Sequence, residues 1–479
     1  MILAEKKSKS LLFKIILWMF PVLFLTDDIL GFNGYQFTIA GKSIRIILFV
    51  ISMAVLCLYS LYIILKEKML LPNRENGEVK LLKLIRPIDC AVLAFVLGNA
   101  VWATVVPLLV RGEMKFSLKD FSCILVLALY FPIAFLIRTG RLNFKIIENI
   151  TYILTIILAI WHCVMYIGET ISPGFYASYY DFIDIISFGT AVRSSVVFGY
   201  GIVRIIQTTS LFLLLGAFLS LKKFLKKGWL HLLPLLIFTF ALCITYTKSI
   251  WFGYVAGLFL FLVAGVILNK DKKMKIKSGL ALIIAVLMIV VLNFAVLNNT
   301  VFERTFNTVR SEQSVEEMQK LMEELANAGE DITELQNKIK DALGTQEANS
   351  LRAAQNGALL GKWSESKWVG FGYGSYVEDC IRNEQFPYMY ESTLPALIMK
   401  LGLAGATLWI AFIGFATVYA IKTFWKENKS NAFLWLGIAL SYAMAVQTNP
   451  FLFTFAGMSM LLYLLISLQR KHNFSEVEE

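Results

Sequence analysis

The sequence is dominated by a succession of apolar stretches of about twenty residues each, the length of helix that crosses a bilayer core about 30 Å thick. Of 479 residues, 57% are hydrophobic and 16% are charged, whereas a soluble domain has roughly 25% charged residues. A surface wetted on all sides cannot be built from this composition, and 37 phenylalanines are too many for a disordered chain. These observations exclude a soluble enzyme, a collagen-like fibre and a disulfide scaffold.

About twelve such stretches can be delimited, which predicts an all-α, polytopic membrane protein. The first is the weakest, because it is short and contains Lys14 and Pro21. A cleaved signal peptide is the alternative there, but Thr26-Asp27-Asp28 is a poor cleavage site. The predicted spans are residues 11–25, 44–65, 88–110, 121–138, 146–167, 202–221, 229–247, 249–268, 278–297, 394–421, 432–448 and 451–469.

Lysine and arginine gather in the loops on one side of this arrangement, together with both termini. The positive-inside rule therefore predicts that the N and C termini are cytoplasmic. The net charge of +11 is explained by this topology, so it does not indicate a nucleic-acid partner. The basic residues of the cytoplasmic side include Lys6, Lys66, Lys80, Arg138, Lys145, Lys222, Lys223, Lys226, Lys227, Lys272, Lys275, Lys277, Lys422 and Arg470.

Two predicted outside segments are long, and they divide the chain into three parts. Residues 1–297 hold the earlier spans, with an outside loop at 168–201. Residues 298–393 form a large, acidic outside loop, and residues 394–479 hold the last spans and a cytoplasmic tail. The fold expected from the sequence is thus a membrane-embedded helical body with a large extracytoplasmic loop.

The large loop has two parts of different character. A capping box that begins at Ser314, followed by apolar residues at helical spacing, predicts a helical hairpin over 312–343. Its charges are typical of a solvated face, and a partner-binding surface is the alternative. Residues 350–391 are rich in glycine and aromatics, and the Gly-Phe-Gly-Tyr-Gly run at 370–374 permits tight turns or close approach to a ligand. This run lacks the Walker lysine and serine, so no nucleotide site is predicted.

A few cations on the outside are not explained by topology. Lys248 lies in Thr-Tyr-Thr-Lys-Ser-Ile-Trp (245–251), where two predicted spans meet almost without a loop. An ionisable group there is a functional candidate, and a snorkelling lysine that marks a helix end is the alternative. Arg193, Arg204 and Arg352 belong to the same outer layer. Together the four cations suit a pyrophosphate, although any one arginine alone is also explained by a loop salt bridge.

Three carboxylates are candidates for acid or base chemistry. Glu391 precedes a predicted span, where partial burial would favour its use as a general base. A helix N-terminal acid, favoured by the helix dipole, is the alternative. Asp27 and Asp28, in the first outside loop, are either a catalytic acid pair or, as we favour, a cap before a turn. The sequence has no zinc-ligand spacing, so no metal is predicted.

Three segments resemble the O-antigen ligase and O-antigen polymerase family of bacterial membrane glycosyltransferases. Residues 247–251 are similar to the family's Ser-Arg-Gly-type hairpin, with lysine where arginine is commoner. A run from Arg352 through two tryptophans to Gly374 resembles the Arg-to-Trp-to-Gly-x-Gly run of the large periplasmic loop. Residues 391–405 resemble the loop exit, where a polar residue precedes a span that reads Leu-Gly-x-x-Gly. The resemblance covers residues 190–415, and the order of its segments makes it specific.

The resemblance implies transfer of a glycan from a polyprenyl-pyrophosphate carrier on the outer leaflet of the bacterial inner membrane. It implies inversion of the anomeric configuration, and no cofactor, nucleotide sugar or metal. The expected partners are the lipid-linked oligosaccharide, the bilayer and other polysaccharide assembly proteins. The implied site residues are Glu391 as catalytic base, Arg193, Arg204, Lys248 and Arg352 as pyrophosphate ligands, and Trp368, Tyr373 and Tyr388 as acceptor or glycan contacts.

One departure from the family pattern favours a polymerase. Ligases of the family resemble one another in placing a histidine at the loop exit, where this chain has Glu391, and its three histidines lie outside the predicted outer loops. We therefore favour a polymerase that extends a lipid-linked repeat unit over a ligase that uses another acceptor. A flippase for the same lipid is a further alternative, but the chain lacks the related halves typical of transporters. A transferase of another class, using Asp27 and Asp28, is the last.

Overall fold

A computed structural model describes most of the helical body of the chain. The residues that it describes are 14–19, 38–39, 42–70, 79–110, 112–186, 196–199, 202–268, 272–296, 320, 350–381, 384, 386–427 and 429–469. The predicted hairpin at 312–343 lies outside them except for Lys320, and so do Asp27, Asp28 and Arg193.

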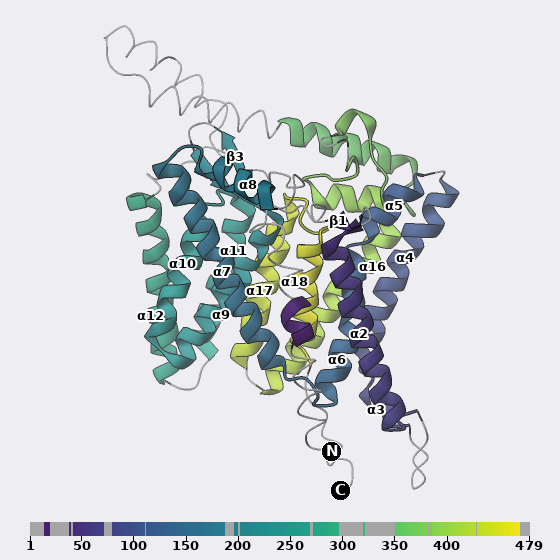
Figure 1. Cartoon of the computed structure of the whole chain (residues 1–479), viewed down its shortest axis with the longest axis horizontal. Coiled ribbons are helices and arrows are strands. Elements are labelled where there is room, and N and C mark those ends of the chain that lie inside the picture. Colours follow the sequence, from purple (N-terminus) through teal and green to yellow (C-terminus); the bar gives the residue numbers. More distant parts are fainter. Residues whose placement is uncertain are drawn as a thin grey trace.

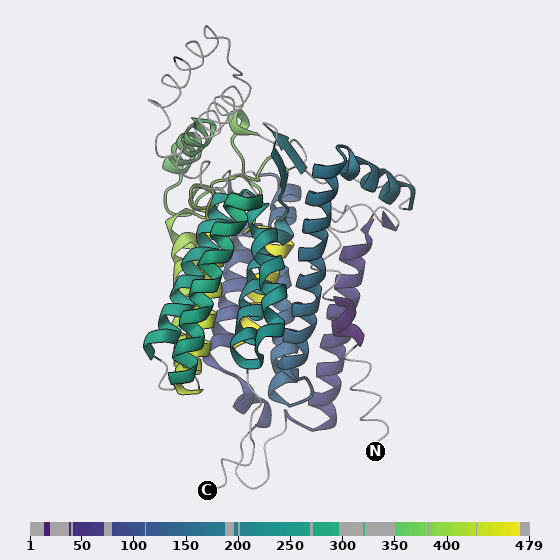
Figure 2. The same cartoon turned by 90° about the vertical axis from the view of Figure 1, so that its left-hand side faces the viewer.

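The described residues form a body of helices that lie side by side with their long axes roughly parallel (Figure 1). The same alignment is visible in the view turned by 90°, where the helix of residues 350–365 lies beyond one end of the body (Figure 2). The main helices are α2 (Ile44–Lys66), α4 (Pro87–Leu109), α5 (Met114–Phe121), α6 (Tyr130–Arg138), α7 (Phe144–Ile171), α8 (Phe175–Ile186), α9 (Leu211–Lys227), α10 (Leu232–Cys243), α11 (Lys248–Leu268), α12 (Lys272–Val291), α16 (Thr393–Glu427), α17 (Lys429–Gln447) and α18 (Phe455–Ile466).

Seven of the described helices are long and apolar enough to cross a membrane, which confirms a helical membrane protein. An eighth is added if the segments Met114–Phe121 and Ile124–Arg138, which meet at an angle of 42°, form one broken span. Two further apolar helices, Trp229–Cys243 and Phe455–Ile466, are shorter. A helix of 12 residues such as α18 rises only about 18 Å, less than the bilayer core. By helix length and composition, the described residues therefore hold seven or eight candidate spans, fewer than the twelve predicted from the sequence.

Short antiparallel hairpins interrupt the helical pattern, which the sequence did not indicate. In the predicted outside loop 168–201, the Glu169 carboxylate holds the start of α8. It accepts hydrogen bonds from the backbone N–H groups of Gly174 and Tyr176 at 2.8 Å each. A hairpin follows α8, and Figure 1 shows both at one end of the helical body, with the short helix α3 (Lys80–Leu84) at the other. The strand pairs are β1 (Thr38–Ile39) with β2 (Lys42–Ser43), and β3 (Val196–Gly199) with β4 (Ile202–Ile205).

The close contact between α11 and α17 fixes the ends of both helices. A Cβ atom on Gly257 would lie only 2.3 Å from the carbonyl oxygen of Gly437, so the two backbones approach through glycine. The Ser441 hydroxyl oxygen lies 2.7 Å from the carbonyl oxygen of Gly253. Because the helices run antiparallel, the start of α11 lies beside the end of α17.

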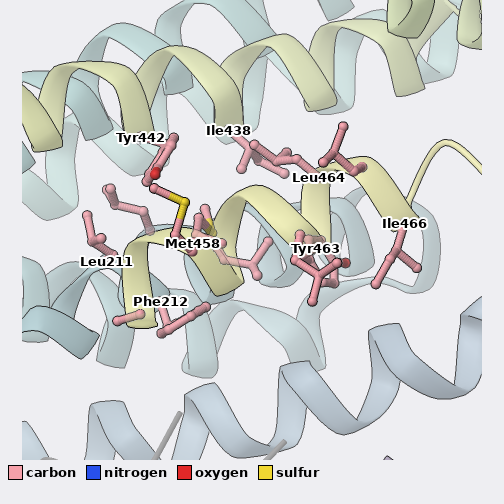
Figure 3. Close-up of a cluster of buried hydrophobic side chains, with 14 of the residues drawn as sticks. Leu211, Phe212, Ile438, Tyr442, Met458, Tyr463, Leu464 and Ile466 are labelled. Carbon is pink, nitrogen blue, oxygen red and sulfur yellow. The ribbon is translucent and has the colours of Figure 1, made fainter. Parts of the chain in front are cut away.

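The short helix α18 packs in the middle of the body. Figure 3 shows Met458 and Leu464 of this helix among side chains of α9 and α17, including Phe212 and Tyr442. The Tyr442 hydroxyl donates to the carbonyl oxygen of Gly457 at 3.0 Å. A helix buried in this way holds the connection that precedes it, residues 448–454, against the ends of the neighbouring helices.

Helix α16 is broken at Gly402, and the glycine-rich run fits into the break. Gly402 has a φ of +61°, and a Cβ atom there would lie 2.4 Å from the Trp368 carbonyl oxygen. The Gly372 N–H donates to the Lys400 carbonyl oxygen at 2.7 Å, and the Ala404 N–H donates to that of Trp368 at 3.0 Å. The glycines thus permit a close approach, but the approach observed is to a helix of the same chain.

Candidate functional site

Arg204 is attached to the tight turn between α10 and α11. Its Nε donates to the carbonyl oxygen of Thr245 at 2.9 Å, and its Nη2 donates to the hydroxyl of Thr247 at 3.1 Å. Tyr246 has a φ of +45°, which lets the chain reverse between Cys243, the last residue of α10, and Lys248, the first of α11. The turn therefore brings the cations of Arg204 and Lys248 into one region, although they are far apart in the sequence.

Asn449 links the start of α11 to the start of α16. Its side-chain amide donates to the Ser249 hydroxyl at 2.7 Å, and its backbone carbonyl oxygen lies 3.2 Å from the Thr393 hydroxyl, which also donates to the Val446 carbonyl oxygen at 2.5 Å. Ser249 directly follows Lys248, and Thr393 lies two residues after Glu391. The contact between α11 and α17 explains this position, because it holds the end of α17 beside the first turn of α11. The sequence analysis did not identify Asn449, whose Asn-Pro pair indicates only a turn.

Glu391 forms an ion pair with Arg352. The guanidinium Nε of Arg352 donates to the carboxylate Oε2 of Glu391 at 2.7 Å, and the Arg352 side chain is 39% exposed and that of Glu391 29%. An ionised carboxylate is both the form that pairs with a guanidinium and the form that can accept a proton. Next to Glu391, burial raises the pKa of the Tyr390 phenol, whose oxygen accepts the Val377 N–H at 2.7 Å. The charged pair thus borders a neutral, buried tyrosine.

The structure connects the segments that carry four of the five charged candidates: the segments of Arg204 and Lys248 on one side of Asn449, and those of Arg352 and Glu391 on the other. Arg193, the fifth, lies outside the described residues. The four belong to segments connected by short polar contacts, and each side chain is partly exposed. Cations around a carboxylate at a surface can bind an anionic group and accept a proton beside it.

The three aromatic candidates differ in accessibility. Trp368 is 72% exposed, whereas Tyr388 and Tyr373 are buried. The Tyr373 hydroxyl donates to the side-chain oxygen of Asn99, which also accepts the Trp409 indole N–H at 3.0 Å. The structure therefore places Tyr373 among the residues that join the glycine-rich run to the helices.

A buried ion pair between Asp120 and Lys400 was missed by the sequence analysis. The Lys400 Nζ lies 2.6 Å from the Asp120 Oδ2, and the side chains are 2% and 1% exposed, respectively. The same carboxylate oxygen accepts the Gly374 N–H at 2.9 Å. The ammonium also lies 5.0 Å from the ring centroid of Phe453 and 5.4 Å from that of Tyr388. The position of Lys400 inside the predicted span 394–421 indicates that an oppositely charged side chain lies beside it.

A second ion pair joins α4, α6 and the end of α18. The Arg138 guanidinium donates to both carboxylate oxygens of Asp89, at 2.5 and 2.6 Å, and to the side-chain oxygen of Gln469. The Tyr130 hydroxyl donates to Asp89 as well. Arg138 was assigned to the topogenic set, and the structure adds a packing role for it.

Comparison with known proteins gives no match to a family model and no match to a curated protein.

Proposed function

We propose that this protein is a surface-polysaccharide polymerase of the bacterial inner membrane. It transfers a glycan from polyprenyl pyrophosphate to the end of a lipid-linked repeat unit on the outer leaflet. The observation that carries the proposal is the chain of contacts that connects the segment of Arg204 and Lys248, through Asn449, to the segment of Glu391 and its partner Arg352. A base and a group of cations are what this transfer requires.

The proposed topology has about twelve spans, cytoplasmic termini, and the large loop outside. Two features support it. Two apolar helices are shorter than the other spans, Trp229–Cys243 and Phe455–Ile466. At their ends the chain continues in non-helical conformations, so each membrane-crossing segment is longer than its helix. The lysines at the end of α9 and those at the start of α12 also lie at the helix ends remote from Lys248, as the positive-inside rule requires.

In the proposed reaction, an acceptor hydroxyl attacks the anomeric carbon of the donor glycan. The new carbon–oxygen bond forms while the bond from that carbon to the pyrophosphate oxygen breaks, so the configuration inverts. The hydroxyl proton passes to the carboxylate of Glu391, and the electron pair leaves with the polyprenyl pyrophosphate. Arg204 and Lys248 stabilise the negative charge that develops on the leaving group, and Arg193 keeps the same predicted role.

Arg352 has two functions in this proposal. Its Nε holds the Glu391 carboxylate at 2.7 Å and so fixes the direction in which the base faces the acceptor. Its remaining N–H groups lie in the plane of the guanidinium, an arrangement that suits hydrogen bonds to a phosphate or a sugar hydroxyl. Trp368 is near Arg352 in the sequence, and its exposed indole offers an apolar face to the glycan.

The test is turnover of a polyprenyl-pyrophosphate oligosaccharide by the purified protein in vesicles. We expect products longer than the supplied repeat unit, and Glu391→Gln should reduce their formation by roughly a hundredfold or more. Glu365→Gln, which removes an exposed carboxylate from the helix of residues 350–365, is the matched control and should leave chain extension unchanged. Translocation of the lipid without extension would contradict the proposal, and full extension by Glu391→Gln would exclude this carboxylate as the base.

A further inference from the structure

A cavity of about 650 Å³ lies between α7, α9, α16, α17 and α18, at the end of the body remote from Glu391. Asn431 in the first turn of α17 lines it, whereas the candidate site lies beyond the last turn of the same helix. Its walls combine two chemistries. The apolar part includes Phe144, Leu219, Phe424, Leu434, Trp435 and Ile438, and the charged part comprises Lys145, Lys222, Lys223, Lys226, Lys227 and Glu148.

The charges of the cavity lining are unbalanced, because five lysines face one carboxylate. Glu148 pairs with Lys222, whose Nζ lies 2.5 Å from its Oε2. Lys223 donates to the side-chain oxygen of Asn149 at 3.0 Å, which is a neutral partner. Within the part of the chain that the structure describes, three other lysines of the lining form no ion pair with a carboxylate, although the charge of Glu148 also acts on the second of them; they are Lys145, Lys226 and Lys227.

The positive-inside rule explains lysines on this side, but not their convergence. Topology requires only that cations lie in the loop, where they can point apart into water. Here Lys145 comes from the start of α7 and Lys226 from the end of α9. Lys226 experiences the positive charges of Lys222 and Lys145, and the single carboxylate of Glu148 offsets them only in part. Like charges held near one another are unfavourable, and a bound anion would offset their repulsion. Tyr463 also lines the cavity, and its phenol is a neutral hydrogen-bond donor.

We propose that this cavity binds the phosphate group of an anionic ligand, with Lys145, Lys226 and Lys227 as its principal ligands. The apolar walls beside the lysines favour a phospholipid of the cytoplasmic leaflet over free phosphate, because Leu219 and Trp435 can contact its hydrocarbon part. The ligand is thus distinct from the glycan donor of the proposed reaction. It occupies the opposite end of the body, where its binding joins α7, α9 and α17.

The test compares the melting temperature of the purified full-length protein in a neutral detergent with three additives. These are phosphatidylglycerol, phosphatidylcholine and inorganic phosphate. We expect phosphatidylglycerol to raise the melting temperature and to remain bound in native mass spectrometry, with no effect of phosphatidylcholine. In the Lys145→Gln/Lys226→Gln/Lys227→Gln variant, we expect the affinity for phosphatidylglycerol to fall by on the order of a hundredfold, as removal of three cations near a phosphate predicts.

The matched control is Lys272→Gln/Lys275→Gln/Lys277→Gln, which removes the same charge from α12 on the same side but outside the cavity. It should bind phosphatidylglycerol as the unmodified protein does. The variant with arginine at positions 145, 226 and 227 keeps the three charges and should still bind phosphatidylglycerol. Its binding would show that substitution at these positions does not by itself disrupt the fold. Stabilisation by inorganic phosphate alone, lost in the cavity variant, would support the site and identify its ligand as a free phosphate. Equal effects of phosphatidylglycerol on the cavity and control variants, or equal effects of phosphatidylcholine, would overturn the proposal.

Discussion

Two ion pairs with almost the same length lie in very different surroundings. The distance between the charged atoms is 2.7 Å in Arg352–Glu391 and 2.6 Å in Lys400–Asp120. The first pair has side chains that are 39% and 29% exposed, and the second has side chains that are 2% and 1% exposed. The length of an ion pair therefore does not reveal its role, and its surroundings must be compared.

The surroundings of the buried pair satisfy its charges within the protein. Asp120 also accepts the Gly374 N–H, and the ammonium of Lys400 lies near two aromatic rings. Arg352, in contrast, uses only its Nε in hydrogen bonds to described residues, which leaves its two amino groups for a ligand. We infer that the buried pair fastens the glycine-rich run to α16, whereas the exposed pair acts on a ligand. The predictions that follow test this contrast.

The largest effect is expected from Lys400→Met, which leaves Asp120 buried without its partner. Removal of one member of a buried pair costs about 3–5 kcal/mol, so the purified variant should melt far below the unmodified protein or fail to accumulate in the membrane. The double variant Asp120→Asn/Lys400→Met buries no charge and should recover most of the lost stability. Equal melting temperatures of the single variant and the unmodified protein would show that the pair does not fasten the run.

Arg352→Gln should have the opposite balance of effects. Because the pair is partly exposed, the loss of stability should stay below about 1 kcal/mol, visible as a small shift of the melting temperature. Chain extension should fall by roughly tenfold or more, since the base is no longer held by a guanidinium. Arg352→Lys keeps the charge but not the planar fork, and it should retain an intermediate rate. A variant that melts early but extends chains normally would reverse the assignment of the two pairs.

The contrast also separates what the sequence could predict from what it could not. Hydropathy located the turn that carries Lys248, because two apolar stretches meet there with few polar residues between them. The structure confirms this turn between Cys243 and Lys248. Local features of this kind depend on neighbouring residues, which a linear sequence displays directly.

The partners of long-range contacts were not predictable in the same way. Asp120 lies just before the predicted span 121–138, and Lys400 lies 280 positions away inside the span 394–421. Hydropathy averages over neighbouring residues, so it does not pair the two. Asn449 reaches Ser249 only because glycines let α17 approach α11 closely. The glycine-rich run likewise signalled a close approach, but nothing in it specified that the approach is to the break at Gly402. Such pairings are determined by packing, which requires the arrangement of the helices.

A smaller effect is expected from Asn449→Ala, which removes the link between the two halves of the candidate site. The side-chain amide donates to Ser249 at 2.7 Å and to the Ala445 carbonyl oxygen at 3.1 Å, so the cost in stability should be about 1 kcal/mol. Chain extension should fall by roughly severalfold, because the cations near α11 are no longer held beside the base. Gln447→Ala, which truncates an exposed side-chain amide at the last residue of α17, is the matched control and should extend chains normally. Equal rates for both variants would show that the link has no part in the reaction.

The smallest effect is expected from Lys362→Gln, on the same helix as Arg352. Lys362 pairs with Glu365 at 2.9 Å, with side chains 37% and 59% exposed, and its ammonium lies 4.6 Å from the ring centroid of Phe371. An exposed pair of this kind contributes about 0.5 kcal/mol or less, so stability and chain extension should both be nearly unchanged. The variant removes the same charge as Arg352→Gln from the same element. If both variants slowed extension equally, a diffuse positive potential would explain the reaction better than the contact between Arg352 and Glu391.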